Sequence, residues 1–175
     1  MEDPLALENR RRIYRLISDR PGTHIREMQR QLDMQTGLLS YHLDQLERRG
    51  LIRSESDGYR RRYFPSEGYL MADRRTISLL RQESPRRILM HLLVNGETTF
   101  SELREELEVS KSTLSYHLKK LAKAGVIESG RREREKLYWV ESPQRVGDLL
   151  VFIGESIEGD AVDRFADIWE KMGKG

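Results

Sequence analysis

The sequence predicts a mainly α-helical α+β protein in which one small domain occurs twice and is followed by further helices. Three observations lead to this prediction. The pentapeptide Leu-Ser-Tyr-His-Leu occurs at residues 39–43 and again at residues 114–118, which is an offset of 75 residues. Leucines recur at helical spacing within each copy, and the apolar period becomes strand-like after a glycine in each copy.

The two copies align without a gap far beyond the pentapeptide. Residues of the first copy match residues 75 positions later in the following pairs: Arg11-Arg12-Ile13 with Arg86-Arg87-Ile88, Thr23 with Thr98, Glu27 with Glu102, Leu32 with Leu107, Gly50 with Gly125 and Tyr63 with Tyr138. So much ungapped agreement implies that one fold is used twice.

Stop and start signals define the first two helices of each copy. Pro21-Gly22 ends the first helix in one copy, and Asn95-Gly96 ends its counterpart. The second helix of the second copy begins either with a capping box of Thr99 and Glu102 or with a cap at Ser101.

The third helix of each copy is amphipathic and has one apolar stripe. It begins after Gln35 in the first copy and after Ser110 in the second, and it ends at Gly50 or Gly125. Its leucines recur at i, i+4 and i+7, namely Leu39, Leu43 and Leu46, and Leu114, Leu118 and Leu121. We therefore expect one buried face and one free face.

A β-hairpin follows the third helix in each copy. The strands of the first hairpin flank a turn at residues 56–58, and those of the second flank a charged turn at residues 130–135. Three helices followed by a hairpin make a winged helix, and the short turn before the third helix is the corner of a helix-turn-helix.

These elements divide the chain into four parts. Residues 1–65 form a first winged-helix domain, residues 66–84 a linker with a helix over 72–83, residues 85–142 a second winged-helix domain, and residues 143–175 a helical tail with a break near Gly159-Asp160. The apolar stripe of the tail is too long to stay in water. We expect the tail to pack on the second domain or on another copy of the chain.

Charge and composition narrow the class of function. Residues 1–142 hold 27 Lys and Arg against 22 Asp and Glu, whereas the tail holds 4 against 7. This asymmetry suggests a polyanionic partner for residues 1–142 and a protein contact for the tail. The absence of cysteine excludes disulfides, thiolate metal sites and nucleophilic thiols. The longest apolar run, residues 149–153, is far shorter than the roughly 20 residues of a membrane span, so we expect a cytoplasmic protein with no membrane partner.

With these residues in view, the chain resembles winged-helix regulators of the ArsR/MarR type, in particular archaeal regulators that carry two such units followed by helices. The resemblance rests on residues 110–118, on Gly125-Val126-Ile127, on Tyr63-Phe64-Pro65 and on tail residues 155–165. It implies a sequence-specific double-stranded DNA-binding regulator of transcription. The first copy departs from the pattern because it has Thr36-Gly37-Leu38 where polar contacts are usual, so its role in reading bases stays open.

Candidate DNA contacts lie on the third helices and on the wings. A helix that enters the major groove needs short polar groups at its N-terminus, and arginines at a hairpin tip can reach a minor groove or a phosphate. The candidates are Lys111, Ser112, Thr113, Ser115, Tyr116, Lys119, Lys120, Arg131, Arg132 and Arg134 in the second copy, and Thr36, Ser40, Tyr41, Gln45, Arg60, Arg61 and Arg62 in the first. Strand alternation places Arg60 and Arg62 on one face and Arg61 on the other, so we expect only part of each cluster to touch DNA.

Other site types find less support. We expect His42 and His117 to lie at the edge of the leucine stripe with a hydrogen bond inside their own domain, rather than to bind a metal. No catalytic motif or cofactor motif is present, so we expect neither an enzyme nor a cofactor.

Two alternatives stay open. The chain could be a winged-helix interaction module of a chromosome-organising or polymerase-associated complex, as the apolar Leu38 hints. We expect a homodimer formed through the tail and the linker helix, but two units in one chain could also act as a bivalent monomer.

Overall fold

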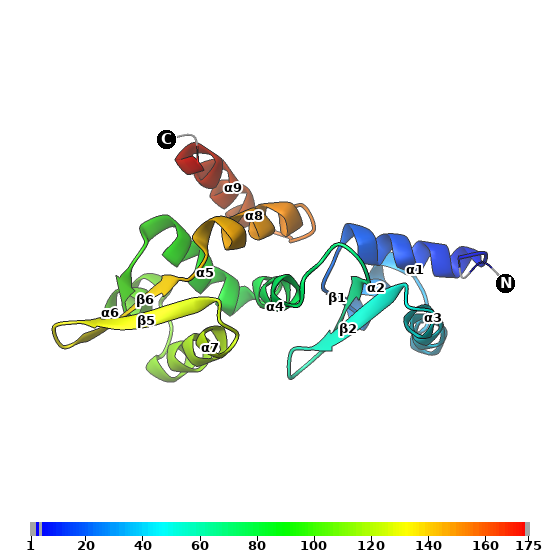
Figure 1. Cartoon of the computed structure of the whole chain (residues 1–175), viewed down its shortest axis with the longest axis horizontal. Helices are drawn as coiled ribbons and strands as arrows, with labels where there is room; N and C mark the ends of the chain where they lie inside the picture. Colours follow the sequence, from blue (N-terminus) through cyan, green and yellow to red (C-terminus); the bar gives the residue numbers. More distant parts are fainter. Residues whose placement is uncertain (1–2, 4, 174–175) are drawn as a thin grey trace. The chain divides into compact units, whose positions relative to one another are not determined.

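The computed structural model describes residue 3 and residues 5–173, and it divides into two units, Met1–Ser78 and Leu79–Gly175 (Figure 1). The outer limits predicted for the first domain and the tail, residues 1 and 175, lie outside the described residues. The division falls within residues 66–84, the segment expected to be a linker.

The first unit is a three-helix domain with a small sheet. Its elements are α1 (Glu8–Asp19), β1 (Thr23–His24), α2 (Ile25–Leu32), α3 (Thr36–Arg48), β2 (Ile52–Ser56) and β3 (Arg61–Pro65), and α4 (Met71–Leu80) follows and crosses the division. The strands form an antiparallel sheet in the order β1-β3-β2, with Thr23 opposite Tyr63 and Ser54 on the other side of Tyr63.

The second unit repeats this arrangement and adds the tail. Its elements are α5 (Glu83–Asn95), β4 (Thr98–Thr99), α6 (Phe100–Leu107), α7 (Lys111–Lys123), β5 (Ile127–Arg132), β6 (Glu135–Val140), α8 (Pro143–Gly154) and α9 (Asp160–Gly173). The sheet order is β4-β6-β5, and Thr98 lies opposite Tyr138 just as Thr23 lies opposite Tyr63. The predicted fold class, two winged helix-turn-helix domains followed by helices, is confirmed.

Both cores are built on the predicted leucine stripes. The six leucines of α3 and α7 are at most 2% exposed: Leu39, Leu43, Leu46, Leu114, Leu118 and Leu121. They pack against the first helix of their own unit, where Ile13 and Ile17 are fully buried in unit one and Leu89 is fully buried in unit two. Burial of side chains of this size stabilises a fold by about 1.5–3 kcal/mol each.

The helix-turn-helix corner is fixed in the same way in both units. Nη2 of Arg12 donates to the carbonyl of Leu32 at 2.9 Å, and Nη2 of Arg87 donates to the carbonyl of Leu107 at 3.0 Å. These carbonyls belong to the last turns of α2 and α6, where a helix has no further N–H group of its own to donate to them. Asp33 and Glu108, which follow these carbonyls, both have a φ of 51°, so the chain turns in the same way into α3 and α7.

Local details differ from the predictions in three places. The two-residue strands β1 and β4 were not predicted, because their pairing with β3 and β6 joins distant segments. The turn of the second hairpin contains only Glu133 and Arg134, because the strands continue into the charged segment. The linker helix ends at Leu80 instead of residue 83, and α5 begins at Glu83. The capping box at the start of α6 is confirmed, with Thr99 and Glu102 bonded in both directions.

The tail packs on α5 of the second unit, which is one of the two predicted outcomes. The break between α8 and α9 covers residues 155–159, close to the predicted site. Trp169 stacks on Phe165 with the ring centroids 5.7 Å apart, and its indole lies directly over Gly147, where a Cβ atom would approach within 2.2 Å. Among the described residues, no helix has both the length and the apolar character that crossing a membrane requires.

Candidate nucleic-acid interface

The N-terminus of α7 is capped from within and open to solvent. Oγ of Ser110 accepts a hydrogen bond from the backbone N–H of Thr113 at 3.2 Å and donates to Oγ1 of the same residue at 2.8 Å. Lys111, Ser112 and Thr113 are all exposed. The predicted polar contact groups of the second unit therefore lie on an accessible helix start, where the dipole favours an anion.

The rest of α7 continues the same face. Tyr116 is 61% exposed and Lys119 is exposed, whereas Ser115 and Lys120 are half-buried. Nζ of Lys120 donates to Oε1 of Gln82 at 2.7 Å, which ties this lysine to the start of the second unit. The helix holds four lysines and no acidic residue, so its free face is strongly positive.

The wing of the second unit carries exposed arginines. Arg131, Arg132 and Arg134 are exposed, and within the described part of the chain none of them forms a hydrogen bond or an ion pair through its side chain. Gly130 in β5 lies against Trp139 of β6, so the stem of this hairpin is packed while its tip stays open. These guanidinium groups are free to meet an external anion.

The counterpart helix in the first unit has a different surface. Thr36 accepts a hydrogen bond from Nε2 of Gln29 at 2.6 Å, and Leu38 is 42% exposed where α7 has Thr113. Tyr41 is 54% exposed, like its counterpart on α7, and Ser40 and Gln45 are half-buried. α3 carries one arginine against two acidic residues, so it lacks the positive charge of α7.

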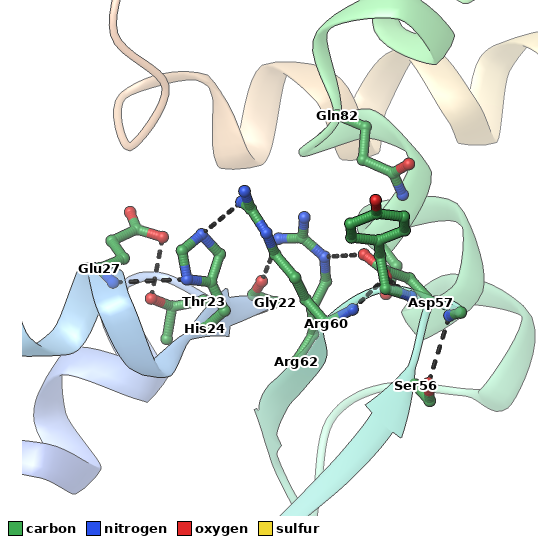
Figure 2. Close-up of polar contacts among 12 residues, drawn as sticks. Gly22, Thr23, His24, Glu27, Ser56, Asp57, Arg60, Arg62 and Gln82 are labelled. Atoms are coloured by element: carbon green, nitrogen blue, oxygen red, sulfur yellow. Dashed lines mark hydrogen bonds and ion pairs between the residues drawn. The ribbon is translucent and has the colours of Figure 1, made fainter. Parts of the chain in front are cut away.

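The arginines of the first wing are mostly engaged within their own unit (Figure 2). Nη2 of Arg61 pairs with Glu47 on α3 at 2.7 Å. Nε of Arg62 pairs with Asp57 at 2.7 Å, and its Nη1 donates to the carbonyl of Gly22 at 2.9 Å. The side chains of this second pair are only 4% and 5% exposed. The prediction that Arg62 contacts DNA is corrected, because its guanidinium is buried inside the domain.

Asp57 organises the tip of the first wing. Its Oδ1 accepts hydrogen bonds from the backbone N–H groups of Tyr59 and Arg60, at 3.0 and 2.8 Å. Burial opposes ionisation of this carboxyl group, but the hydrogen bonds from Arg62 and from the two N–H groups outweigh burial and hold the pKa of Asp57 below its ordinary value. The carboxylate is therefore part of the structure of the wing.

Comparison with known proteins agrees with this duplicated architecture. Residues 7–77 match an N-terminal HTH domain, and residues 83–129 match the arsR family of bacterial regulatory proteins. The chain is a tandem helix-turn-helix protein of the ArsR-like type. Over 141 residues, 79% of its length, it is 31% identical to an uncharacterized HTH-type transcriptional regulator of Methanocaldococcus jannaschii. The chain spans about a third of the length of that relative, 35%.

The two recognition-helix histidines of this tandem ArsR-like protein occupy equivalent places. His42 and His117 lie at the edge of the leucine stripe, next to the rings of Tyr41 and Tyr116 at 5.2 and 5.1 Å. Nδ1 of each is buried and has no partner among the described residues, so the predicted hydrogen bond is not formed at this atom. Burial lowers the pKa of both rings, with Arg10 adding to the effect at His42 and Lys120 at His117. In the described part of the chain, no three acidic or histidine side chains converge as a metal site would require.

Sequence reasoning missed a group of basic residues on α2 of the tandem protein. His24 caps the start of α2, Arg26 lies in its first turn and Arg30 in its last turn, and all three line one cleft with Arg60 of the wing. The repeat itself held a signal for this group. At the positions 75 residues later the second unit has Thr99, Ser101, Glu105 and Glu135, none of which is basic.

Proposed function

We propose that this protein is a regulator of transcription that binds double-stranded DNA sequence-specifically through its second unit. The observation that carries the proposal is the face of α7. Three leucines of α7 are buried, whereas its polar N-terminus and three of its four lysines are exposed. A helix of this kind, held by a helix-turn-helix corner and followed by a wing, has the geometry that places a recognition helix in a major groove.

The residues of α7 divide into two roles under this proposal. Ser112, Thr113 and Tyr116 lie on the exposed N-terminal half, where short polar and phenolic groups can reach base edges. Lys119 and the arginines of the wing lie farther along the surface and are suited to backbone phosphates. The proposed regulator needs no catalytic step, since its whole action consists of binding.

The alternative of a winged-helix protein-interaction module is less well supported. Such a module needs an apolar docking face, and the exposed face of α7 is polar and positively charged. Leu38 and Tyr41 make the corresponding face of α3 more apolar, but the acidic Asp44 and Glu47 follow them on the same helix. The DNA proposal therefore rests on the second unit.

A matched pair of double variants tests the proposal. The preferred duplex is first selected from a random pool with the full chain, and its affinity is then compared with that of a scrambled duplex. Thr113→Ala with Tyr116→Ala should reduce the preference by about tenfold or more, because a good base contact contributes about 1–3 kcal/mol of discrimination. Leu38→Ala with Tyr41→Ala, the equivalent pair in α3, is the control and should change the preference much less.

The salt dependence of the affinity provides a second test of the same complex. Neutralising 6–10 phosphates should lower affinity by about three to five decades between 50 and 200 mM salt. A preference that survives the α7 double variant, or a chain that is indifferent to duplexes in dilute buffer, would refute the proposal.

We further propose that two copies pair through the tail. Ile168 and Met172 lie one turn apart on α9 and are 44% and 48% exposed, although the other side of this helix packs on α5. A symmetric pair would match a palindromic site. Light scattering of the purified protein should give twice the chain mass of 20.6 kDa. A mass of one chain would instead favour a monomer whose two units bind together.

A further inference from the structure

A basic cleft lies between α2 and the wing tip of the first unit. Its volume is about 600 Å³, and its lining residues are His24, Arg26, Gln29, Arg30 and Arg60. Among the described residues, Arg26 and Arg30 have neither a hydrogen bond nor an ion pair through their side chains. Three guanidinium groups therefore share one open cleft that contains no carboxylate.

The contacts of His24 show what this cleft lacks (Figure 2). Its Nδ1 accepts a hydrogen bond from the backbone N–H of Glu27 at 3.4 Å, and its Nε2 lies 2.9 Å from Nη1 of Arg60. Both neighbours are donors, and a neutral imidazole can accept at only one of its two nitrogens. In either neutral tautomer of His24, one of these two contacts therefore places an N–H group of the ring against the N–H group of its neighbour. In a protonated ring, both contacts do so. The arrangement calls for an external acceptor.

Strand alternation places this cleft on its own side of the wing. Arg61 points to α3, where it pairs with Glu47, whereas Arg60 and the buried Arg62 point the other way, toward His24 and Gly22. A ligand that binds beside Arg60 therefore lies on the other side of the wing from Arg61 and α3.

The second unit shows that the fold does not require the cluster. Ser101 and Glu135 stand at the positions of Arg26 and Arg60, and Oγ of Ser101 donates to Oε1 of Glu135 at 3.1 Å. Thr99 replaces His24 and caps α6 without conflict. The same place thus holds an internally satisfied, acidic pair in one unit and unsatisfied cations in the other.

We propose that the cleft lined by His24, Arg26, Arg30 and Arg60 binds a phosphate group. Planar guanidinium groups bind phosphate oxygens with two parallel hydrogen bonds, and a phosphate oxygen can accept from Arg60 and from Nε2–H of His24 together. The phosphate belongs either to a small phosphorylated molecule or to a DNA backbone. In the second case the inference rests on the proposed function and gives the first unit a positioning contact with the duplex.

The test uses the full chain and inorganic phosphate as the probe. NMR signals of the His24 ring and of the Arg60 guanidinium are followed as phosphate is added, with chloride at the same ionic strength as the reference. The variant is Arg26→Ser with Arg60→Glu, which recreates the pair that the second unit already accommodates. Arg15→Gln, an exposed arginine on α1 outside the cleft, is the matched control.

We expect saturable phosphate-dependent shifts in the parent chain and the Arg15 variant, and at least a tenfold weaker response in the cleft variant. Shifts that appear with a duplex of random sequence but not with free phosphate, and that the cleft variant abolishes, assign the site to the DNA backbone. The salt slope for that duplex should then be smaller by about one for each phosphate that the cleft variant no longer binds.

The inference is overturned if neither probe shifts His24 beyond the chloride reference, or if the cleft variant responds like the parent. These results leave the α7 experiment untouched, because it concerns only the second unit. Conversely, if the chain binds phosphate but no duplex, the proposed function is refuted and the phosphate site in the cleft is supported.

Discussion

The two units share a fold but carry their positive charge on different elements. In the second unit α7 holds four lysines and no acidic residue, and α6 holds one arginine against three glutamates. In the first unit the order is reversed, because α3 has one arginine against two acidic residues and α2 has two arginines against one glutamate. The leucine stripes of α3 and α7 are buried alike, but the basic residues of the two units lie on different helices. The fold alone therefore does not decide which face meets an anion.

The interiors of the two wings differ as well. Arg62 of β3 is buried beside Asp57, whereas the same two positions of the second unit hold Leu137 and Arg132. Leu137 is buried, and Arg132 is exposed. The first wing is held by an internal ion pair, and the second leaves its arginines to the solvent. The two wings therefore differ in how many of their arginines are held within the domain.

The largest expected effect comes from breaking the ion pair of the first wing. Asp57→Asn leaves the buried charge of Arg62 without its partner, and we expect the first unit to lose about 3–5 kcal/mol of stability at neutral pH. Urea unfolding followed at first-unit signals measures the change. If the loss stays below 1 kcal/mol, the pair does not hold the wing together.

The pH dependence of the same variant gives a second check. Because the folded-state pKa of Asp57 lies below its ordinary value of 3.8, its contribution is complete above that value and is lost as the pH falls through the lower, folded-state pKa. The variant should therefore lose less stability than the parent on acidification below about pH 4. Asp57→Asn with Arg62→Leu keeps an acceptor for the backbone N–H groups of Tyr59 and Arg60 and copies the apolar residue of the second unit, so it should recover most of the loss.

The repeat made most of the fold predictable from the sequence. The spacing of Leu114, Leu118 and Leu121 gave the buried stripe of α7, and the glycine at residue 125 gave its end. Thr99 and Glu102 indicated one of the two predicted starts of α6, the one that is observed, because a capping box involves only residues three apart in the chain. Features of this kind depend on local spacing, which a sequence displays directly.

The features that were missed depend on contacts between distant segments. β1 and β4 have two residues each and exist only because β3 and β6 lie beside them. Alternation placed Arg62 correctly on the side of Arg60, but nothing local shows that Asp57 and the carbonyl of Gly22 would bury it. The alignment of Arg62 with Leu137 was the one available hint of a core position.

A smaller effect compares the caps of α2 and α6. Thr99→Ala removes a hydroxyl that accepts from the N–H of Glu102 at 3.2 Å, and it should cost the second unit about 1 kcal/mol. His24→Ala removes a weaker cap at 3.4 Å and relieves the contact of Nε2 with Arg60, so the first unit should lose less than half as much. Thermal unfolding of the two variants gives the comparison. Equal losses would mean that His24 is an ordinary cap, which would weaken the donor conflict described for the cleft.

The smallest expected effect concerns Gly37, which occupies the place of Ser112 at the start of the recognition helix. A Cβ atom at this position meets nothing within 4 Å, so Gly37→Ala should stabilise the first unit by about 0.5–1 kcal/mol through the unfolded chain. Gly50→Ala is the contrasting control, because a φ of +73° makes alanine costly there. If α7 alone reads bases, Gly37→Ala leaves the affinity for the selected duplex unchanged while Ser112→Ala lowers it. A loss of affinity in the Gly37 variant would instead show that the start of α3 also approaches DNA closely, and the division between the two units would have to be redrawn.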